Sequence, residues 1–221
     1  MTRFPSFPYI APFAVFLALL LILPRLAVPE LADQIARVAV TAAVLALCSR
    51  QVIDLRVGRW IGSVLVGVLV FAVWIAPDLL VPGYRHHPWF ENPIMGYARS
   101  SLSAPARTQA PVLLFRSIRA VLIVPIVEEL FWRAWLMRWI ILPDFRKVPL
   151  GQYAPLAFWA AAVLFACEHG SYWDVGLAAG VAYNWWMVRT RSLGDLILAH
   201  AVTNACLSAY VILAGKWEYW L

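Results

Sequence analysis

Two adjacent glutamates and an arginine, Glu128, Glu129 and Arg133, lie inside a long apolar stretch of the sequence. If this stretch crosses a membrane, each charge costs about 3 kcal/mol there unless it has a partner. Glu129 and Arg133 are one helical turn apart, so the arginine can keep the Glu129 carboxylate ionised. Glu128 lies on a different face of the same helix, and it is therefore the better candidate for chemistry.

Three further polar residues, His169, His200 and Asn204, occur in other apolar segments, and the last two are one helical turn apart. A carboxylate near a histidine can share a proton with it and activate water as a general base. A second histidine and an asparagine amide can donate hydrogen bonds to a developing oxyanion. Each group alone could simply satisfy a neighbouring helix. Together they exceed what helix packing requires, and they favour a catalytic site.

The composition indicates what kind of protein positions these groups. The 221 residues are 63% hydrophobic and 14% charged, whereas soluble domains are roughly 45–50% apolar and about 25% charged. The apolar residues form continuous blocks, without the alternation typical of a transmembrane β-barrel. The sequence therefore predicts an all-α, polytopic helical membrane protein. The net charge of +6 comes mostly from residues between the spans, and without a basic stripe it does not indicate nucleic-acid binding.

We expect about seven transmembrane helices, and a range of six to eight fits the pattern. Their approximate bounds are residues 10–23, 31–47, 60–75, 112–142, 153–169, 173–188 and 193–213. The long polar stretch 77–111 is expected to be an extramembrane loop with a short interfacial helix at about 93–102. Residues 1–111 then comprise the first three spans and this loop, and residues 112–221 form the catalytic helical core of one integral membrane domain.

The basic residues between the spans predict the orientation of the chain. With a cytoplasmic N-terminus, nine of them lie inside and five outside, which favours this orientation because cytoplasmic loops are enriched in Lys and Arg. The inner set is Arg3, Arg50, Arg56, Arg59, Arg138, Arg146, Lys147, Arg189 and Arg191. Two others, Arg116 and Arg119, are expected at the start of their span, where they extend to lipid headgroups or hold a substrate's C-terminal carboxylate.

The spans place the candidate groups at different depths in the membrane. Glu128 falls near the middle, His169 near one end of its span and His200 about two turns from the opposite surface. At about 1.5 Å of rise per residue, these depths differ by several ångströms to more than ten. A kink at Pro125, a longer fifth span or a tilted last span would bring the groups level. A catalytic site requires that all three surround one water-accessible cavity.

Three motifs follow one another in the second half of the chain: Glu128-Glu129-x-x-x-Arg133, Phe165-x-x-x-His169 and His200-x-x-x-Asn204. In residue type, spacing and order they resemble those of the CPBP family of intramembrane proteases. This is the CAAX-protease and bacteriocin-processing family, which includes the Ras-converting CAAX endopeptidase of eukaryotes. The resemblance covers about residues 112–213 and implies an intramembrane endopeptidase.

The resemblance also implies a role for each motif residue. Glu128 and His169 would activate the attacking water, and His200 and Asn204 would stabilise the tetrahedral intermediate. The second glutamate and the arginine of the first motif would be a supporting pair. Family members are described both as metalloproteases and as metal-free glutamate proteases. The sequence lacks a His-Glu-x-x-His motif, so we favour no metal cofactor, and a zinc site would have to use Glu128, His169 and His200.

The expected partners are the lipid bilayer and a membrane-protein or lipidated-peptide substrate. Bacterial relatives of this length accompany exosortase and PEP-CTERM protein-sorting systems, which favours such a system as a partner and the bacterial inner membrane as the location. Two other functions stay open. One is a non-catalytic scaffold or immunity protein of the same fold, although this chain retains every motif residue. The other is a proton-coupled transporter, although the paired repeats typical of transporters are not visible.

Overall fold

The computed structural model describes residues 4–220, and helices dominate this part of the chain. The first three helices are α1 (Phe7–Ile22), α2 (Glu30–Val44) and α3 (Trp60–Leu80). A long rod then runs from Ala110 to Ile141. The last three helices are α7 (Pro155–Cys167), α8 (Trp173–Thr190) and α9 (Leu193–Ala214).

The long rod consists of three α-helical pieces joined by two π-helical turns. Its pieces are α4 (Ala110–Ile118), α5 (Val124–Phe131) and α6 (Met137–Ile141). The π turns are Arg119–Ile123 and Trp132–Leu136. Pro125 lacks an amide hydrogen, and the first π turn ends directly before Val124, so the irregular backbone lies where the proline disturbs the hydrogen-bond ladder. The chain continues through Pro125 as a helix.

The prediction of an all-α polytopic membrane protein is confirmed. The described residues form seven helical rods when α4, α5 and α6 are taken as one. Five of these rods are long and apolar enough to cross a membrane, and α7 is a shorter apolar helix. The bounds of the rods lie within a few residues of the expected spans, except that α3 continues to Leu80.

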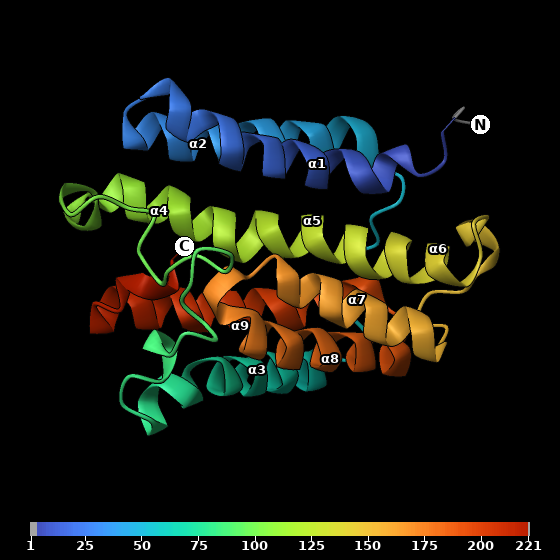
Figure 1. The fold of residues 1–221 in the computed structure, drawn as a ribbon. Coiled ribbons are helices and arrows are strands. Elements are labelled where there is room, and N and C mark those ends of the chain that lie inside the picture. The colour runs from blue at the N-terminus through green and yellow to red at the C-terminus, as the bar shows by residue number, and fades with distance from the viewer. Residues whose placement is uncertain (1–3, 221) are drawn as a thin grey trace.

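The helices form layers on either side of the long rod (Figure 1). On one side, α1 packs against α5, and α2 packs against α4. On the other side lie α7, α8 and α9, and α3 packs along α9 and α8. Gly67 permits the close approach of α3 to α9, because a Cβ atom there would lie 2.4 Å from the Ala199 carbonyl oxygen. The first three helices thus pack on the C-terminal half, and the boundary at residue 111 stays a prediction.

The segment between α3 and α4 differs from the expectation. Instead of an interfacial helix at 93–102, the chain forms turns there, so that prediction was wrong. The Asn92 side chain accepts hydrogen bonds from the amides of Ile94 and Met95 at 2.9 and 3.0 Å. Gly96 has a positive φ of 82°. A side chain that satisfies local amides and a left-handed glycine both stabilise a turn against a helix.

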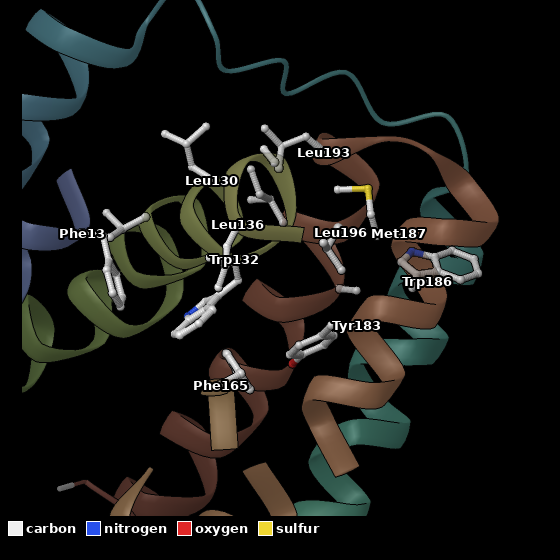
Figure 2. Close-up of a cluster of buried hydrophobic side chains, with 14 of the residues drawn as sticks. Phe13, Leu130, Trp132, Leu136, Phe165, Tyr183, Trp186, Met187, Leu193 and Leu196 are labelled. Atoms are coloured by element: carbon white, nitrogen blue, oxygen red, sulfur yellow. The ribbon is translucent and has the colours of Figure 1, made fainter. Parts of the chain in front are cut away.

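A cluster of buried apolar side chains fixes the centre of the bundle (Figure 2). Leu130, Phe165 and Leu196 come from three different rods and are at most 1% exposed. Close packing of this kind restricts the rotation of the helices that carry the polar motifs. Arg3, one of the charges used to predict the orientation, lies outside the described residues. The orientation in the membrane stays a prediction.

Candidate active site

Glu129 and Arg133 form a buried ion pair at the junction of α5 and the second π turn. Arg133 Nη1 lies 3.1 Å from the Glu129 carboxylate, and both side chains are fully buried. Arg133 Nε also donates a 2.8 Å hydrogen bond to the side-chain oxygen of Asn184 on α8. The guanidinium carbon lies 4.5 Å from the centroid of the Phe165 ring. A buried charge needs several such partners to offset its desolvation, and here they come from three rods.

His200 on α9 connects both glutamates. Its Nδ1 atom lies 2.7 Å from Glu129 Oε1, and its Nε2 atom lies 4.0 Å from Glu128 Oε2. The Tyr183 ring stacks on the imidazole at 4.8 Å between centroids. An ionised Glu129 can only accept a hydrogen bond, so Nδ1 carries the proton in this contact. The second ring nitrogen is left on the side of Glu128.

Glu128 differs from its neighbour because its carboxylate lacks a close partner. The side chain is buried, with 7% of the residue's surface exposed. Its Oε2 atom is buried and has no hydrogen-bond partner among the described residues. Leaving a buried carboxylate oxygen unsatisfied is costly. One of two adjacent acids is therefore held firmly by the protein, and the other remains available to another group.

His169 follows α7 in the turn that leads to α8. Its Nδ1 atom lies 2.7 Å from the Phe165 carbonyl oxygen, which can only accept, so Nδ1 carries a proton and Nε2 is the basic nitrogen of the neutral ring. The Trp74 ring meets the imidazole edge-on, 5.2 Å away. Gly176 supports it from α8, where a Cβ atom would lie 3.2 Å from His169 Cβ. These contacts orient the ring.

Asn204 lies one turn after His200 on α9. Its side-chain nitrogen donates a 2.8 Å hydrogen bond to the Ala120 carbonyl oxygen. Ala120 belongs to the first π turn, whose altered hydrogen bonding leaves backbone groups for side chains. This contact uses one of the two N–H groups of the Asn204 amide, and it leaves the second N–H and the side-chain oxygen free of this bond. Asn204 is thus anchored across two rods.

One cavity of about 240 Å³ unites the predicted catalytic groups. Glu128, His169, His200 and Asn204 all line it. Phe13 on α1 and Trp220 near the end of the chain contribute apolar and aromatic walls. The depth difference expected from the sequence therefore does not separate the groups. The supporting pair Glu129 and Arg133 lies behind this wall and does not line the cavity.

The structure also adds residues that sequence reasoning did not assign to the site. Tyr183 stacks on His200 and donates a 2.8 Å hydrogen bond to Thr203. Glu168 lines the cavity and accepts a 2.9 Å hydrogen bond from Trp132 Nε1. A tyrosine beside an asparagine in an apolar span was a usable signal, because a buried hydroxyl needs a partner. No sequence pattern connects Trp132 with Glu168.

Arg116 and Arg119 are placed differently from one of the two sequence expectations. They were expected at the membrane surface, in contact with headgroups or a substrate carboxylate. Both are buried, with 8% and 3% of their surface exposed, and both line the cavity. The π turn that contains Arg119 and the packing of α2 against α4 enclose these side chains. Their burial inside the bundle favours the interpretation as a contact for a substrate carboxylate over contact with headgroups at the surface.

The side chains considered for zinc do not fit a metal site. Among residues 4–220, no three His, Cys, Asp or Glu side chains are grouped so that they could hold a metal ion. Structural and catalytic zinc sites need three or four ligands within about 2.3 Å. We therefore derive no chemical step through a metal.

Fold and site together define a polytopic α-helical membrane protein with two carboxylates and two histidines around an internal cavity. Comparison with protein families found one similarity: residues 110–206 match the model of the Rce1-like family of type II CAAX prenyl endopeptidases. The match agrees with the resemblance to the CPBP family, and it supports a membrane endopeptidase in general. Comparisons with curated proteins and with solved structures found no match.

Proposed function

We propose that the protein is an intramembrane endopeptidase that hydrolyses a peptide bond of a membrane-associated protein or peptide. The match of residues 110–206 to the model of an endopeptidase family supports this proposal. The observation that carries it is the buried Oε2 atom of Glu128, which has no hydrogen-bond partner and borders the cavity. The position of this costly group at the cavity wall favours a catalytic role over a purely structural one.

Glu128 and His169 activate the attacking water in this proposal. A water molecule between them loses a proton to one of the two groups as its oxygen attacks the carbonyl carbon of the substrate. The basic Nε2 of His169 and the Glu128 carboxylate are suited to this role because neither is consumed by a strong contact within the protein. The same proton then passes to the nitrogen of the leaving amine.

His200 and Asn204 stabilise the oxyanion of the tetrahedral intermediate. A ring nitrogen must carry a proton to donate, so His200 acts as an imidazolium with both nitrogens protonated. Asn204 contributes the amide N–H that is not bound to the backbone.

Glu129 and Arg133 are a supporting pair that does not touch the substrate. Glu129 accepts a hydrogen bond from His200 Nδ1 and thereby orients the ring that faces Glu128. Arg133 keeps Glu129 ionised and connects it to Asn184 on α8. Preorganised donors and acceptors of this kind lower the barrier because they need no reorganisation during the reaction.

Further properties belong to the same proposal. The reaction uses no metal, and the substrate is a membrane protein or a lipidated peptide that reaches the cavity from the bilayer. We place the protein in the bacterial inner membrane with a cytoplasmic N-terminus, in association with a protein-sorting system. The charge distribution supports this orientation. Accessibility of single cysteines introduced at Arg50 and at Arg99 tests it, because the two positions are assigned to opposite sides.

Cleavage by purified protein in lipid vesicles tests the proposal. Candidate membrane-anchored substrates are incubated with wild type, Glu128→Gln and His169→Gln, with and without a chelator. We expect both variants to lose about 10²–10⁴-fold in cleavage rate, and the chelator to have no effect. Glu91→Gln is the matched control, because Glu91 lies in the extramembrane loop and bonds His86. Unchanged cleavage in Glu128→Gln would overturn the mechanism. Loss of activity with chelator would show that the reaction requires a metal ion.

A further inference from the structure

A pair of buried arginines extends the cavity beyond the proposed catalytic groups. Arg116 lies in the last turn of α4, and Arg119 begins the π turn that follows. Both line the cavity, and Arg119 is only 3% exposed. The guanidinium carbon of Arg116 lies 5.1 Å from the centroid of the Trp220 ring, which forms part of the same wall. The proposed mechanism uses neither arginine.

Arg119 lacks partners that a buried guanidinium needs. Its Nε and Nη1 atoms are buried and have no hydrogen-bond partner among the described residues. A guanidinium stays charged in proteins, so it cannot escape this cost by losing its proton. An uncompensated buried charge is strongly destabilising. An arginine in this state at the wall of a cavity indicates that an anion occupies the adjacent space during function.

Asp33 on α2, an acid that acts on Arg119, is already engaged by other side chains. Asp33 acts on Arg119 together with the like charges of Arg116 and Arg37. However, Asp33 is paired with Arg37 on its own helix, at 2.8 Å, and also accepts a 3.0 Å hydrogen bond from Gln34. Asp33 on α2 therefore does not form an ion pair with Arg119, which lines the cavity.

We propose that Arg119, flanked by Arg116, is a subsite that binds a carboxylate of the peptide substrate. This inference rests on the proposed endopeptidase function, and it assigns to the same cavity a second, charged contact that positions the substrate. The planar guanidinium fork matches a carboxylate in two parallel hydrogen bonds, which gives orientation as well as affinity. The carboxylate is either the C-terminus of the peptide or an acidic side chain near it.

The position of the subsite in the helix makes it a contact remote from the bond that is cut. Arg119 precedes Glu128 by nine residues, which corresponds to about 13 Å along a helix axis. An extended peptide advances about 3.4 Å per residue, so the bound carboxylate lies several residues from the reacting carbonyl group. Binding energy from such a remote contact serves to hold the substrate in register for attack.

Peptide binding to the Glu128→Gln protein tests the subsite without requiring cleavage. The probes are three N-acetylated hexapeptides of alanine and leucine: one with a free C-terminal carboxylate, one with a C-terminal amide, and one amide with glutamate as its last residue. Tryptophan fluorescence reports binding because Trp74 and Trp220 line the cavity. We expect the free carboxylate to bind about tenfold more tightly than the plain amide, as for a charge-assisted hydrogen bond. The glutamate peptide shows whether a side-chain carboxylate serves equally well.

Substitutions in the same background assign the effect to Arg119. Arg119→Gln should abolish the preference for the carboxylate, Arg119→Lys should retain part of it, and Arg99→Gln, a change at an exposed loop arginine, should leave it unchanged. Because Arg119→Gln removes an unpartnered buried charge, its melting temperature should not fall. If Arg119 had only a structural role, Arg119→Gln would lower the melting temperature.

Three results would overturn the subsite. They are equal affinity of the free-carboxylate and plain-amide peptides, failure of all three peptides to bind, and a carboxylate preference that persists in Arg119→Gln.

A further comparison tests whether the anion bound by Arg119 is a lipid phosphate. If vesicles of phosphatidylglycerol stabilise the wild type over Arg119→Gln and phosphatidylcholine vesicles do not, the site belongs to a lipid and the proposal fails. Each of these outcomes leaves the cleavage test of Glu128 independent.

Discussion

Two of the buried arginines that the structure describes are each paired with an acid, one behind the cavity and one at the extramembrane loop. Arg133 is bound by Glu129 and Asn184 and contacts the Phe165 ring. Arg85 is bound by Asp78 and Asp174, at 3.3 and 2.6 Å.

The two clusters differ in whether every acid has a close hydrogen-bond or ion-pair partner. Under the loop, Asp78 also accepts a hydrogen bond from Tyr219, and Asp174 accepts one from Tyr84. Behind the cavity, Glu129 is held by Arg133 at 3.1 Å and by His200 at 2.7 Å, although its Oε2 atom has no hydrogen bond. The nearest ion-pair contact given for the adjacent Glu128 is His200, at 4.0 Å. A cluster in which every acid is satisfied joins elements of the fold. A cluster that leaves one acid unsatisfied at a cavity indicates a catalytic role for that acid.

Loss of Arg133 is expected to have the largest effect on stability. Arg133→Met leaves Glu129 buried without its counter-charge, which should cost about 3–5 kcal/mol of unfolding free energy. Chemical unfolding in detergent micelles measures this change. Cleavage activity per folded molecule should also fall, because Glu129 then no longer orients His200. An Arg133→Met protein with wild-type stability would show that the pair is not part of the structural core.

Loss of Arg85 should be less costly and should spare the chemistry. Arg85→Met leaves Asp78 and Asp174 without their partner, but the side chains of these acids retain 19% and 15% of their surface exposed. We expect a loss of about 1–3 kcal/mol and an unchanged cleavage rate per folded molecule. Unfolding and cleavage are measured as for Arg133→Met. A larger effect on cleavage than on stability would remove the distinction between the two clusters.

Tyr183→Phe tests the packing of the site at a smaller scale. The substitution keeps the ring on His200 and removes the hydroxyl that bonds Thr203. Thr203 still has the Gly67 carbonyl oxygen as an acceptor, at 2.9 Å, so the loss should be about 1 kcal/mol. Thermal unfolding measures it, and Tyr183→Leu, which also removes the ring, should reduce cleavage further. Equal cleavage by both variants would show that the stacking does not orient His200.

The loop contributes a small pH-dependent effect. The hydrogen bond between His86 and Glu91, at 2.9 Å, raises the pKa of His86 above its ordinary value of 6.5. Because the pKa is raised in the folded state, the stabilising contribution is complete below about pH 6.5 and is lost as the pH rises through the raised value. NMR titration of the imidazole measures the shift, and Glu91→Gln should abolish it. Cleavage should not follow this titration.

Sequence reasoning identified the helices and the polar motifs, but only part of their connections. The Glu129–Arg133 pair could be predicted because both residues belong to one helix and one turn separates them. The contact of His200 with Glu129 could not, because it depends on how α9 rotates against α5 and on the π turns, which change the faces of the rod. The expected interfacial helix was overruled by Asn92 and Gly96, whose local preferences stabilise turns.

The most direct measurement compares Glu128→Gln with Glu129→Gln in the same vesicles, for both cleavage and melting temperature. We predict that Glu128→Gln loses about 10³-fold in cleavage rate and melts no lower than wild type, because the Oε2 atom of its carboxylate has no hydrogen bond to lose. Glu129→Gln should melt lower, because Arg133 and His200 both lose a charged partner. Cleavage at the wild-type rate by Glu128→Gln would contradict the assignment of the two glutamates.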